Sequence, residues 1–438
     1  MKVLKFGGTS VGSAQRMKDV AKLIKGGERK IVVLSAMSGT TNSLVEISDY
    51  LYKKNPEGAN ELINRLEAKY INHVNQLYET EEYRSRTLDF MKSEFDYLRS
   101  FTKDIFTLFE EKVILAQGEI ISTNMMTNYL LELGENVILL RALDFMRTDK
   151  NGEPDLTYIS QKLKEKLEAK PDYDIYITQG FICRNVYGEI DNLQRGGSDY
   201  TASLIGAAVG TSEIQIWTDI DGMHNNDPRF VDKTSPIRHL LFEEAAELAY
   251  FGAKILHPTC VQPAKFANIP VRLLNTMEPT APGTIISNET EKGCIKAVAA
   301  KDNITAIKIK SSRMLLAYGF LRRVFEIFES YQTAIDMICT SEVGVSMSID
   351  NTKHLNEIVS DLKKYGAVTV DSGMCIICVV GDLDWENLGF ESRAVEAMKN
   401  IPVRMISYGG SNYNISFLIR SSDKRAALQA LSDKLFNQ

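Results

Sequence analysis

The sequence has few of the residues that build disulfide frameworks or metal sites. Its 438 residues include six cysteines and five histidines, and neither set shows the spacing of a disulfide scaffold or a metal centre. Cys375 and Cys378 have the spacing of a redox or zinc motif, but both lie in the apolar run Met374–Val380. Residues three apart on a strand point to opposite faces, so the two sulfurs could not chelate one ion. We therefore expect buried strand cysteines and no metal site built by the protein.

The sequence also lacks an excess of positive charge and any long apolar run. Its formal net charge is −6 at pH 7, whereas nucleic-acid binders are basic at least locally. No stretch approaches the roughly 18 apolar residues that span a bilayer. Gly7 and Gly8 interrupt the first apolar run before it could form a signal peptide. We expect a cytoplasmic protein of two to three domains that binds neither nucleic acid nor membrane.

A glycine loop near the N-terminus has the features of a phosphate-binding site. Residues 3–10 read Val-Leu-Lys-Phe-Gly-Gly-Thr-Ser, and the apolar spacing after them predicts a helix over Ser13–Ile24. Glycines let backbone amides approach a ligand, while a lysine and a helix N-terminus attract an anion. The lysine precedes the glycines, unlike in a Walker A loop, and an ordinary strand-to-helix turn is the alternative. The candidate residues are Lys5, Gly7, Gly8, Thr9 and Ser10.

A second glycine loop and two polar segments strengthen this interpretation. Residues 195–199 read Arg-Gly-Gly-Ser-Asp and lie between a predicted strand over 174–178 and a predicted helix over 200–209. The next predicted strand, 214–217, ends in Thr-Asp-Ile-Asp-Gly, and Lys254 follows later beside a glycine. Open α/β sheets bind ligands where their strands end. Together these segments predict a nucleotide site.

Strand-like and helical patterns alternate over most of the first 290 residues. Residues 48–130 carry apolar side chains every three or four positions, which predicts helices that cover a sheet. Residues 38–42 are predicted to form a polar turn. From 136 to about 290 the alternation returns, and it favours parallel strands joined by helices.

The last third of the sequence contains an internal repeat. Residues 341–349 resemble residues 411–419, and each segment is followed by an amphipathic helix. The first unit has the order βαββαβ, whereas the second runs out of chain after its second helix. We infer that an early strand over 295–299 completes the second unit, so that the first unit is inserted in it. The alternative is a shortened second unit with an open edge, which would expose unpaired backbone groups.

Five motifs occur in the order found in aspartate kinases of the amino-acid kinase superfamily. They are Lys-Phe-Gly-Gly-Thr-Ser, Arg-Gly-Gly-Ser-Asp, Trp-Thr-Asp, Asp-Pro-Arg at 227–229 and Phe-Gly-Ala-Lys-x-Leu-His-Pro at 251–258. The resemblance covers nearly the whole chain, and the paired C-terminal units resemble ACT domains. It implies an αβα sandwich with a mainly parallel sheet, followed by two ACT-like units. The expected boundaries are a catalytic domain over 1–290, a first ACT-like unit over 303–371, and a second over 294–300 plus 372–438.

The resemblance implies a monofunctional enzyme that transfers the γ-phosphoryl group of ATP to the side-chain carboxylate of L-aspartate. This is the first step in the biosynthesis of lysine, threonine and methionine. A carboxyl group with a pKa of about 3.9 is ionised at pH 7, so no general base is required. Catalysis then consists of aligning two anions and neutralising charge. Lys5 is expected to stabilise the transferring group, and Asp199 to organise Lys5. Mg²⁺ is expected to arrive with ATP, held largely by phosphates and water.

The other site residues follow from the same resemblance. The guanidinium of Arg195 can hold the carboxylate of aspartate with two parallel hydrogen bonds, and Glu119 can pair with its ammonium. The residues expected around aspartate are Thr41, Glu119, Phe181, Arg195 and Ser198. The further residues expected around the nucleotide are Ser35, Thr218, Asp219, His224, Arg229 and Lys254. His224 stands where lysine-sensitive members of the family usually carry a tyrosine.

The resemblance also implies feedback control by an amino acid in the first ACT-like unit. The expected effector residues are Met314, Gly319, Phe320, Leu321, Asp336, Ser341 and Glu342. Asp336 and Glu342 could pair with a cationic amino acid, whereas Ala317 stands where a serine is expected. We expect a homodimer joined through the ACT-like units and inhibited by L-lysine, with L-threonine as the competing effector.

Several alternatives remain open from the sequence. The ACT-like units could serve dimerisation without binding a ligand. The enzyme could be another member of the superfamily, such as a glutamate 5-kinase or a uridylate kinase, or the chain could be a non-catalytic amino-acid sensor. We do not expect a fused homoserine dehydrogenase.

Overall fold

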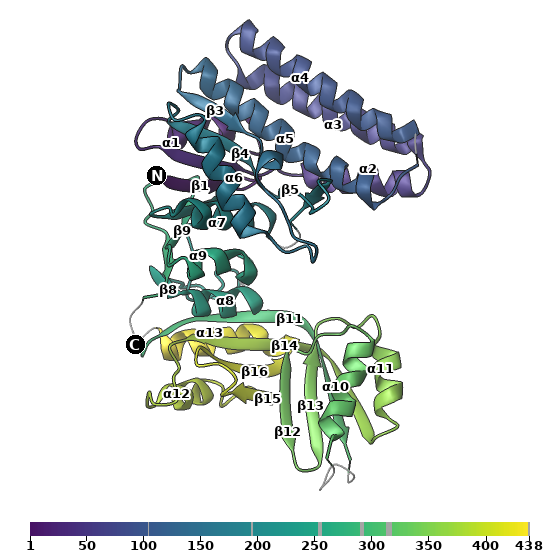
Figure 1. Cartoon of the computed structure of the whole chain (residues 1–438). Coiled ribbons are helices and arrows are strands. Elements are labelled where there is room, and N and C mark those ends of the chain that lie inside the picture. The colour runs from purple at the N-terminus through teal and green to yellow at the C-terminus, as the bar shows by residue number, and fades with distance from the viewer. Residues whose placement is uncertain (104, 194–195, 253–255, 290–292, 312–317, 437–438) are drawn as a thin grey trace. The chain divides into compact units, whose positions relative to one another are not determined.

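The computed structural model describes residues 1–103, 105–193, 196–252, 256–289, 293–311 and 318–436. The chain folds into two compact units (Figure 1). The first comprises residues 1–223 and 256–289, and the second comprises 224–255 and 290–438. Residues 224–255 thus group with the second unit, whereas the sequence predicted an unbroken catalytic domain over 1–290. Among the described residues, no helix is both long and apolar enough to cross a membrane.

A mainly parallel sheet forms the centre of the first unit. Strand β1 (Lys2–Phe6) lies between β2 (Lys30–Leu34) and β7 (Ile214–Thr218), and the three strands run parallel. All residues of β2 are buried, as expected for a strand covered on both faces. Within this unit the order is β3 (Val137–Leu140), β4 (Ile175–Gln179), β2, β1, β7, β9 (Val271–Asn275) and β10 (Thr284–Ser287), with β10 antiparallel to β9.

Amphipathic helices pack on this sheet, as their apolar spacing predicts. The predicted stripe of α1 (Ala14–Ile24) is buried, and the side chain of Ser13 accepts a hydrogen bond from the Arg16 amide at 3.2 Å to begin the helix. The other helical segments are α2 (Thr40–Tyr52), α3 (Pro56–Leu77), α4 (Glu81–Ser100), η1 (Phe101–Lys103), α5 (Leu108–Glu132), η2 (Ala142–Asp144), α6 (Leu156–Glu168), α7 (Gly197–Val209), η3 (Pro258–Val261) and α9 (Gln262–Phe266).

The helical region predicted over 48–130 is confirmed. Figure 1 shows α3 and α4 side by side as a long pair, and α5 contacts α2, α4 and the strands β3 and β4. The turn predicted over 38–42 is wrong in its second half. Gly39 takes the N-cap position with a φ of 81°, so α2 already begins at Thr40.

A short hairpin separates β4 from the second glycine loop. It consists of β5 (Ile182–Arg184) and β6 (Ile190–Asn192), and the sequence analysis did not predict it. The helix after the loop also begins earlier than predicted, at Gly197.

The second unit contains a six-stranded antiparallel sheet with helices. Its sheet order is β12, β13, β11, β14, β16, β15. The elements of this unit are β8 (His239–Leu241), α8 (Phe242–Tyr250), β11 (Ile295–Lys310), α10 (Phe320–Ser330), β12 (Met337–Ser341), β13 (Gly344–Ile349), α11 (Leu355–Leu362), β14 (Ala367–Gly381), α12 (Phe390–Ala397), β15 (Val403–Tyr408), β16 (Asn414–Arg420), η5 (Ser421–Asp423) and α13 (Lys424–Leu435).

Two long strands are shared by both halves of this sheet. The first half of β11 pairs with the end of β14, for instance Val298 with Val379, and its second half pairs with the beginning of β14. The early strand therefore completes the second βαββαβ unit, and the first unit is inserted in it. The fold class predicted from the sequence is confirmed. The sequence predicted separate short strands, but the chain continues through a register shift after Lys301.

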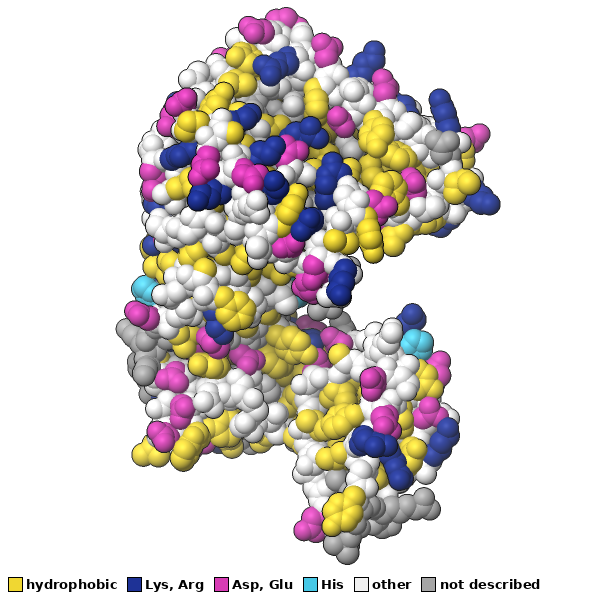
Figure 2. Space-filling model, viewed as in Figure 1, with side chains coloured by type: hydrophobic (Ala, Val, Ile, Leu, Met, Phe, Trp, Pro, Cys, Tyr) yellow, Lys and Arg dark blue, Asp and Glu magenta, His cyan; other side chains and the backbone are white. Residues whose placement is uncertain are grey.

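Charged side chains of both signs cover the first unit. On the face drawn in Figure 2, lysine and arginine lie interspersed with aspartate and glutamate above the helices of this unit.

Each half of the second unit has an apolar cluster of its own, one around Phe417 and one around Phe328.

Candidate active site

The side chains of Lys5 and Asp199 form an ion pair at the carboxyl end of β1. The Nζ atom of Lys5 lies 2.7 Å from Oδ1 of Asp199, and the two side chains are only 11% and 15% exposed. Lys5 is fixed by its place in the sheet, opposite Val33 and Ile216. Asp199 lies in the first turn of α7, which begins within the second glycine loop at Gly197. The ammonium of Lys5, just before the first glycine loop, is thus in contact with Asp199 of the second glycine loop.

The two glycines of the first loop have different roles. The amide of Gly7 donates a hydrogen bond to the carbonyl of Trp217 at 3.2 Å and so continues the β1–β7 ladder. That amide is not free for a phosphate, which corrects the expectation for Gly7. A Cβ atom on Gly8 would lie 2.8 Å from the carbonyl oxygen of Ala36, so only glycine fits there. No described residue accepts a hydrogen bond from the amide of Gly8.

Ser10 anchors the loop instead of facing a ligand. Its side chain is fully buried, and its Oγ atom lies 2.7 Å from Oγ1 of Thr276, which follows β9. The expectation that Ser10 binds the nucleotide is therefore wrong for its hydroxyl. Thr9 is half-buried, and its carbonyl accepts a hydrogen bond from Arg16 at 2.7 Å.

Glu119 is buried at the carboxyl end of β2 with one oxygen unpaired. Its Oε1 atom accepts a hydrogen bond from the amide of Ala36 at 3.2 Å. No described residue donates a hydrogen bond to Oε2, which is buried. Burial raises the pKa of Glu119 to about 8, because a low dielectric disfavours the charged form. An ammonium group beside Oε2 would restore the charged carboxylate.

Gly118 lets α5 carry Glu119 this close to the sheet. A Cβ atom on Gly118 would lie 2.6 Å from the Cβ atom of Ala36 and 3.2 Å from Cγ2 of Thr40. The glycine therefore brings the helix into contact with the segment that follows β2. Ser122, one turn further on, donates a hydrogen bond to the carbonyl of Ser35 at 2.8 Å.

The segment Gly180–Phe181 packs against the first residues of α7, Gly197 and Ser198, next to Asp199 in the sequence. Phe181 has a φ of 67°, which is uncommon for a residue with a side chain, and its amide donates a hydrogen bond to Oγ1 of Thr201 at 3.0 Å. A Cβ atom on Gly180 would lie 2.3 Å from Oγ of Ser198. The end of β4 and the start of α7 are therefore tightly fitted, and strained backbone of this kind is frequent at functional sites.

The remaining predicted residues divide into three groups. Within the first unit, Thr41 is exposed in the first turn of α2, and Thr218 donates a hydrogen bond to Asp219 at the end of β7 at 3.1 Å. His224 and Arg229 belong to the second unit, where Arg229 forms an ion pair with Asp227 at 2.7 Å. Arg195 and Lys254 lie outside the described residues.

Comparisons with known proteins agree with the fold. The profile of the amino acid kinase family matches residues 1–275, and an ACT domain profile matches residues 377–435. Aspartokinase 1 of Arabidopsis thaliana is 35% identical over 99% of this chain and 80% of its own length. Lysine-sensitive aspartokinase 3 of Escherichia coli is 31% identical over 99% of both chains. The chain belongs to the aspartokinase family.

Solved aspartokinase structures share the fold over the whole chain. E. coli aspartokinase III in complex with lysine and aspartate has a TM-score of 0.83 at 31% identity, covering 100% of this chain and 99% of the other. The same E. coli enzyme in complex with aspartate and ADP has a TM-score of 0.80 at 30% identity, with 100% of both chains covered.

The expected effector site of this aspartokinase contains a charge cluster around one buried aspartate, which the sequence did not indicate. The side chain of Asp336 is 1% exposed, and its Oδ1 atom lies 2.7 Å from Nζ of Lys301. The hydroxyl of Tyr250 donates a hydrogen bond to the same atom at 2.8 Å, and Lys301 also lies 3.0 Å from Oδ2 of Asp350. The Oδ2 atom of Asp336 is buried without a hydrogen-bond partner among the described residues.

The other effector residues lie on α10 and around the β12–β13 turn. Gly319 caps α10 with a φ of 81°, Phe320 is buried, and Leu321 is 37% exposed. Ser341 ends β12, and its hydroxyl donates a hydrogen bond to the carbonyl of Gly344 at 3.4 Å, while Glu342 is exposed in the turn. Met314 and Ala317 lie outside the described residues.

Proposed function

We propose that Lys5, Asp199 and Glu119 form the centre at which this aspartokinase phosphorylates the side-chain carboxylate of L-aspartate with ATP. The observation that carries the proposal is the ion pair of Lys5 and Asp199, 2.7 Å long, at the carboxyl end of the central strand. Ligands bind at this edge in open α/β sheets. A cation held there by a carboxylate can meet the charge of a phosphoryl group.

The reaction needs positioning and charge neutralisation rather than proton transfer. An oxygen of the ionised aspartate carboxylate attacks the γ-phosphorus of ATP, and the bond to the bridging oxygen of ADP breaks. The products are 4-phospho-L-aspartate and ADP. Lys5 neutralises the charge that develops on the phosphoryl oxygens, and the amide of Gly8 donates a hydrogen bond to them. Asp199 holds the ammonium of Lys5 in place, so the cation is already oriented when the substrates bind.

Glu119 recognises the ammonium group of aspartate. Its Oε2 atom is buried without a partner among the described residues, and an ammonium is the donor that would satisfy it. Ser198, at the start of α7, and Thr41, at the start of α2, supply polar groups at helix N-termini, which favour a carboxylate. Arg195 is proposed as the bidentate partner of the α-carboxylate.

Magnesium is proposed to enter with ATP. The described residues contain no group of three or more potential metal ligands, so the ion keeps phosphate and water oxygens as its main ligands. Asp219 is exposed at the end of β7 and offers a carboxylate of the kind that hard cations accept. When bound, the ion neutralises the β- and γ-phosphates.

The second unit is proposed to make the enzyme sensitive to L-lysine. The free Oδ2 atom of Asp336 and the exposed carboxylate of Glu342 would pair with the ammonium groups of lysine. Inhibition requires that lysine bind two states of the enzyme with different affinity. L-Threonine is the competing effector, and a homodimer joined through the ACT-like units is the proposed assembly.

One assay tests the catalytic proposal. Purified protein is incubated with Mg·ATP and L-aspartate, and the acyl phosphate is trapped with hydroxylamine as the hydroxamate. We expect hydroxamate with aspartate and much less with L-glutamate. Hydroxamate from glutamate alone, or equal yields from wild type and Lys5→Met, would overturn the proposal.

A further inference from the structure

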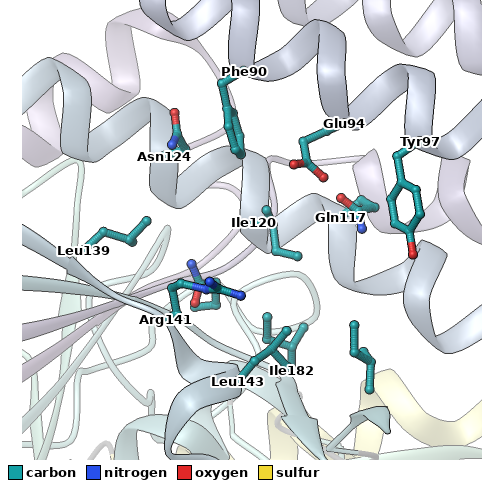
Figure 3. Close-up of a pocket in the computed structure, with 12 residues that line it drawn as sticks. Phe90, Glu94, Tyr97, Gln117, Ile120, Asn124, Leu139, Arg141, Leu143 and Ile182 are labelled. Carbon is teal, nitrogen blue, oxygen red and sulfur yellow. The ribbon is translucent and has the colours of Figure 1, made fainter. Parts of the chain in front are cut away.

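The first unit contains a cavity that neither Lys5 nor Asp199 lines. It has a volume of about 420 Å³, is partly open to solvent, and is lined by residues of α4, α5, the segment around β3 and η2, and the β5–β6 hairpin (Figure 3). This volume is within the usual range of small-molecule pockets. Apolar side chains form much of its wall, among them Ile120, Leu143 and Ile182.

The pocket and the candidate active site use different faces of α5. Gln117, Ile120 and Asn124 line the pocket, and their spacing of three and four residues places them on one face of the helix. Glu119 does not line the pocket, and its carboxylate accepts a hydrogen bond from the amide of Ala36. It lies two residues from Gln117, about 200° around the helix axis. None of the described residues expected around aspartate lines the pocket.

Two opposite charges face this pocket without pairing. Figure 3 shows the carboxylate of Glu94, from α4, and the guanidinium of Arg141, from the end of β3, turned toward the same space. Neither side chain has an ion-pair or hydrogen-bond partner among the described residues. Glu94 is half-buried, and burial raises its pKa above the usual range. A charged Glu94 held in this partly apolar site without a partner is costly, whereas Arg141 is exposed and its guanidinium remains solvated.

Gln117 adds a buried acceptor that also lacks a partner. The side chain is 2% exposed, and its Nε2 atom donates to the carbonyl of Val113 at 3.3 Å. Its Oε1 atom is buried with no hydrogen bond from the described residues. The neighbouring Gln179 differs, because its Oε1 accepts from the amide of Ala142 and its Nε2 donates to Thr123, both at 2.8 Å. The open acceptor in this pocket therefore belongs to Gln117.

We propose that this pocket binds a small zwitterion with an apolar body, namely a free amino acid with an apolar side chain. Its carboxylate would pair with Arg141, and its ammonium would meet the carboxylate of Glu94 and Oε1 of Gln117. The apolar side chain would pack on the wall formed by Ile120 and its neighbours. A simple anion would be repelled by Glu94, and a simple cation by Arg141, so a molecule that carries both charges fits best.

Calorimetric titration of the full-length protein, without nucleotide or aspartate, tests the proposal. L-Leucine, L-methionine and L-phenylalanine are the probes, and we expect saturable binding of at least one. N-acetyl-L-leucine lacks the ammonium group and L-leucinamide lacks the carboxylate, so each should bind at least tenfold more weakly than the parent compound. Absence of binding by all three amino acids would overturn the proposal.

Three variants locate the bound molecule. Arg141→Gln and Glu94→Gln should each weaken binding at least tenfold, while Lys92→Gln, which removes an exposed charge from the same helix, should not. Circular dichroism and the melting temperature check that each variant is folded. Binding that survives both pocket substitutions but is lost in Asp336→Asn would place the amino acid in the second unit and refute the pocket.

Discussion

The ammonium of Lys5 and the carboxylate of Asp199 lie 2.7 Å apart although 194 positions separate them in the sequence. One comes from the end of β1 and the other from the first turn of α7. Both are largely shielded from solvent, so their interaction is screened less than that of a surface pair. The pair therefore orients the cation before the substrates arrive.

Replacement of Lys5 by methionine should reduce turnover by about 10²–10³, because a preorganised charge is lost where negative charge develops. The KM for aspartate should change much less. Steady-state rates of the hydroxamate assay measure both quantities. Lys2→Met, at the exposed start of the same strand, is the matched control. A large rise in the aspartate KM with unchanged turnover would contradict the proposed role.

Asp199→Asn should lower turnover in the wild-type background but add little in the Lys5→Met background. The reason is that Asp199 is proposed to act through the position of the Lys5 ammonium. Residues in direct contact show coupling energies of about 0.5–3 kcal/mol. A double-mutant cycle on kcat measures this coupling. Fully additive effects would show that Asp199 has a separate function.

Aspartate binding near pH 6.5 should release a proton from Glu119. Burial raises the pKa of this carboxyl from 4.5 to about 8 in the free protein, so it is protonated at pH 6.5. The ammonium of aspartate favours the charged carboxylate and lowers that pKa again. Calorimetry in buffers of different ionisation enthalpy counts the protons. Glu119→Gln should abolish this release, and an unchanged release in the variant would refute the assignment.

The same raised pKa predicts how stability depends on pH. Between about pH 4.5 and 8 the folded protein holds a proton on Glu119 that the unfolded chain has lost. Stability should therefore fall as the pH rises through this window, by at most about 1.4 kcal/mol per pH unit for one group. Denaturant unfolding at several pH values measures the slope. Glu119→Gln should have a shallower slope than wild type.

Asp336→Asn should weaken lysine inhibition without lowering turnover in the absence of lysine. The substitution removes the charge that faces a bound ammonium, and charged hydrogen bonds contribute about 1.5–3 kcal/mol, so the half-inhibitory concentration should rise at least tenfold. Initial rates at saturating substrate with millimolar lysine or threonine provide the test. Asp361→Asn removes a half-buried carboxylate of the same unit that pairs with Lys364, and it is the control. Full activity with both effectors, and no shift in melting temperature, would leave the ACT-like units as dimerisation modules only.

Local sequence patterns predicted the parts of the fold that depend on neighbouring residues. The apolar stripe of α1 and the strands around the glycine loops follow from periodicity, and the inserted βαββαβ unit follows from the repeat. The hydrogen bond of the Ser10 hydroxyl was not foreseen, because its partner, Thr276, is distant in the sequence and the burial of Ser10 depends on the finished sheet. From the sequence alone, the hydroxyl of Ser10 was available to a ligand, because nothing indicated that the residue after β9 would bond to it.

Other pairs of side chains that meet across elements carried no sequence signal. The match of Lys301 with Asp336 depends on how β11 and β12 are placed in the sheet. The pocket residues Glu94, Gln117 and Arg141 come from three separate elements. In contrast, Gly118 could have indicated that α5 lies close to the segment after β2, since a glycine inside a helix often has a packing reason.

The long strands β11 and β14 link the stability of the two ACT-like units. Each ACT-like unit contains one half of β11 and one half of β14. Removing one unit by a single truncation would therefore also remove strand residues of the other. Truncation before residue 374 would strip the partner from residues 295–301 and expose an unpaired, aggregation-prone edge. Unfolding or deletion of one ACT-like unit would therefore break the strand pairing of the other.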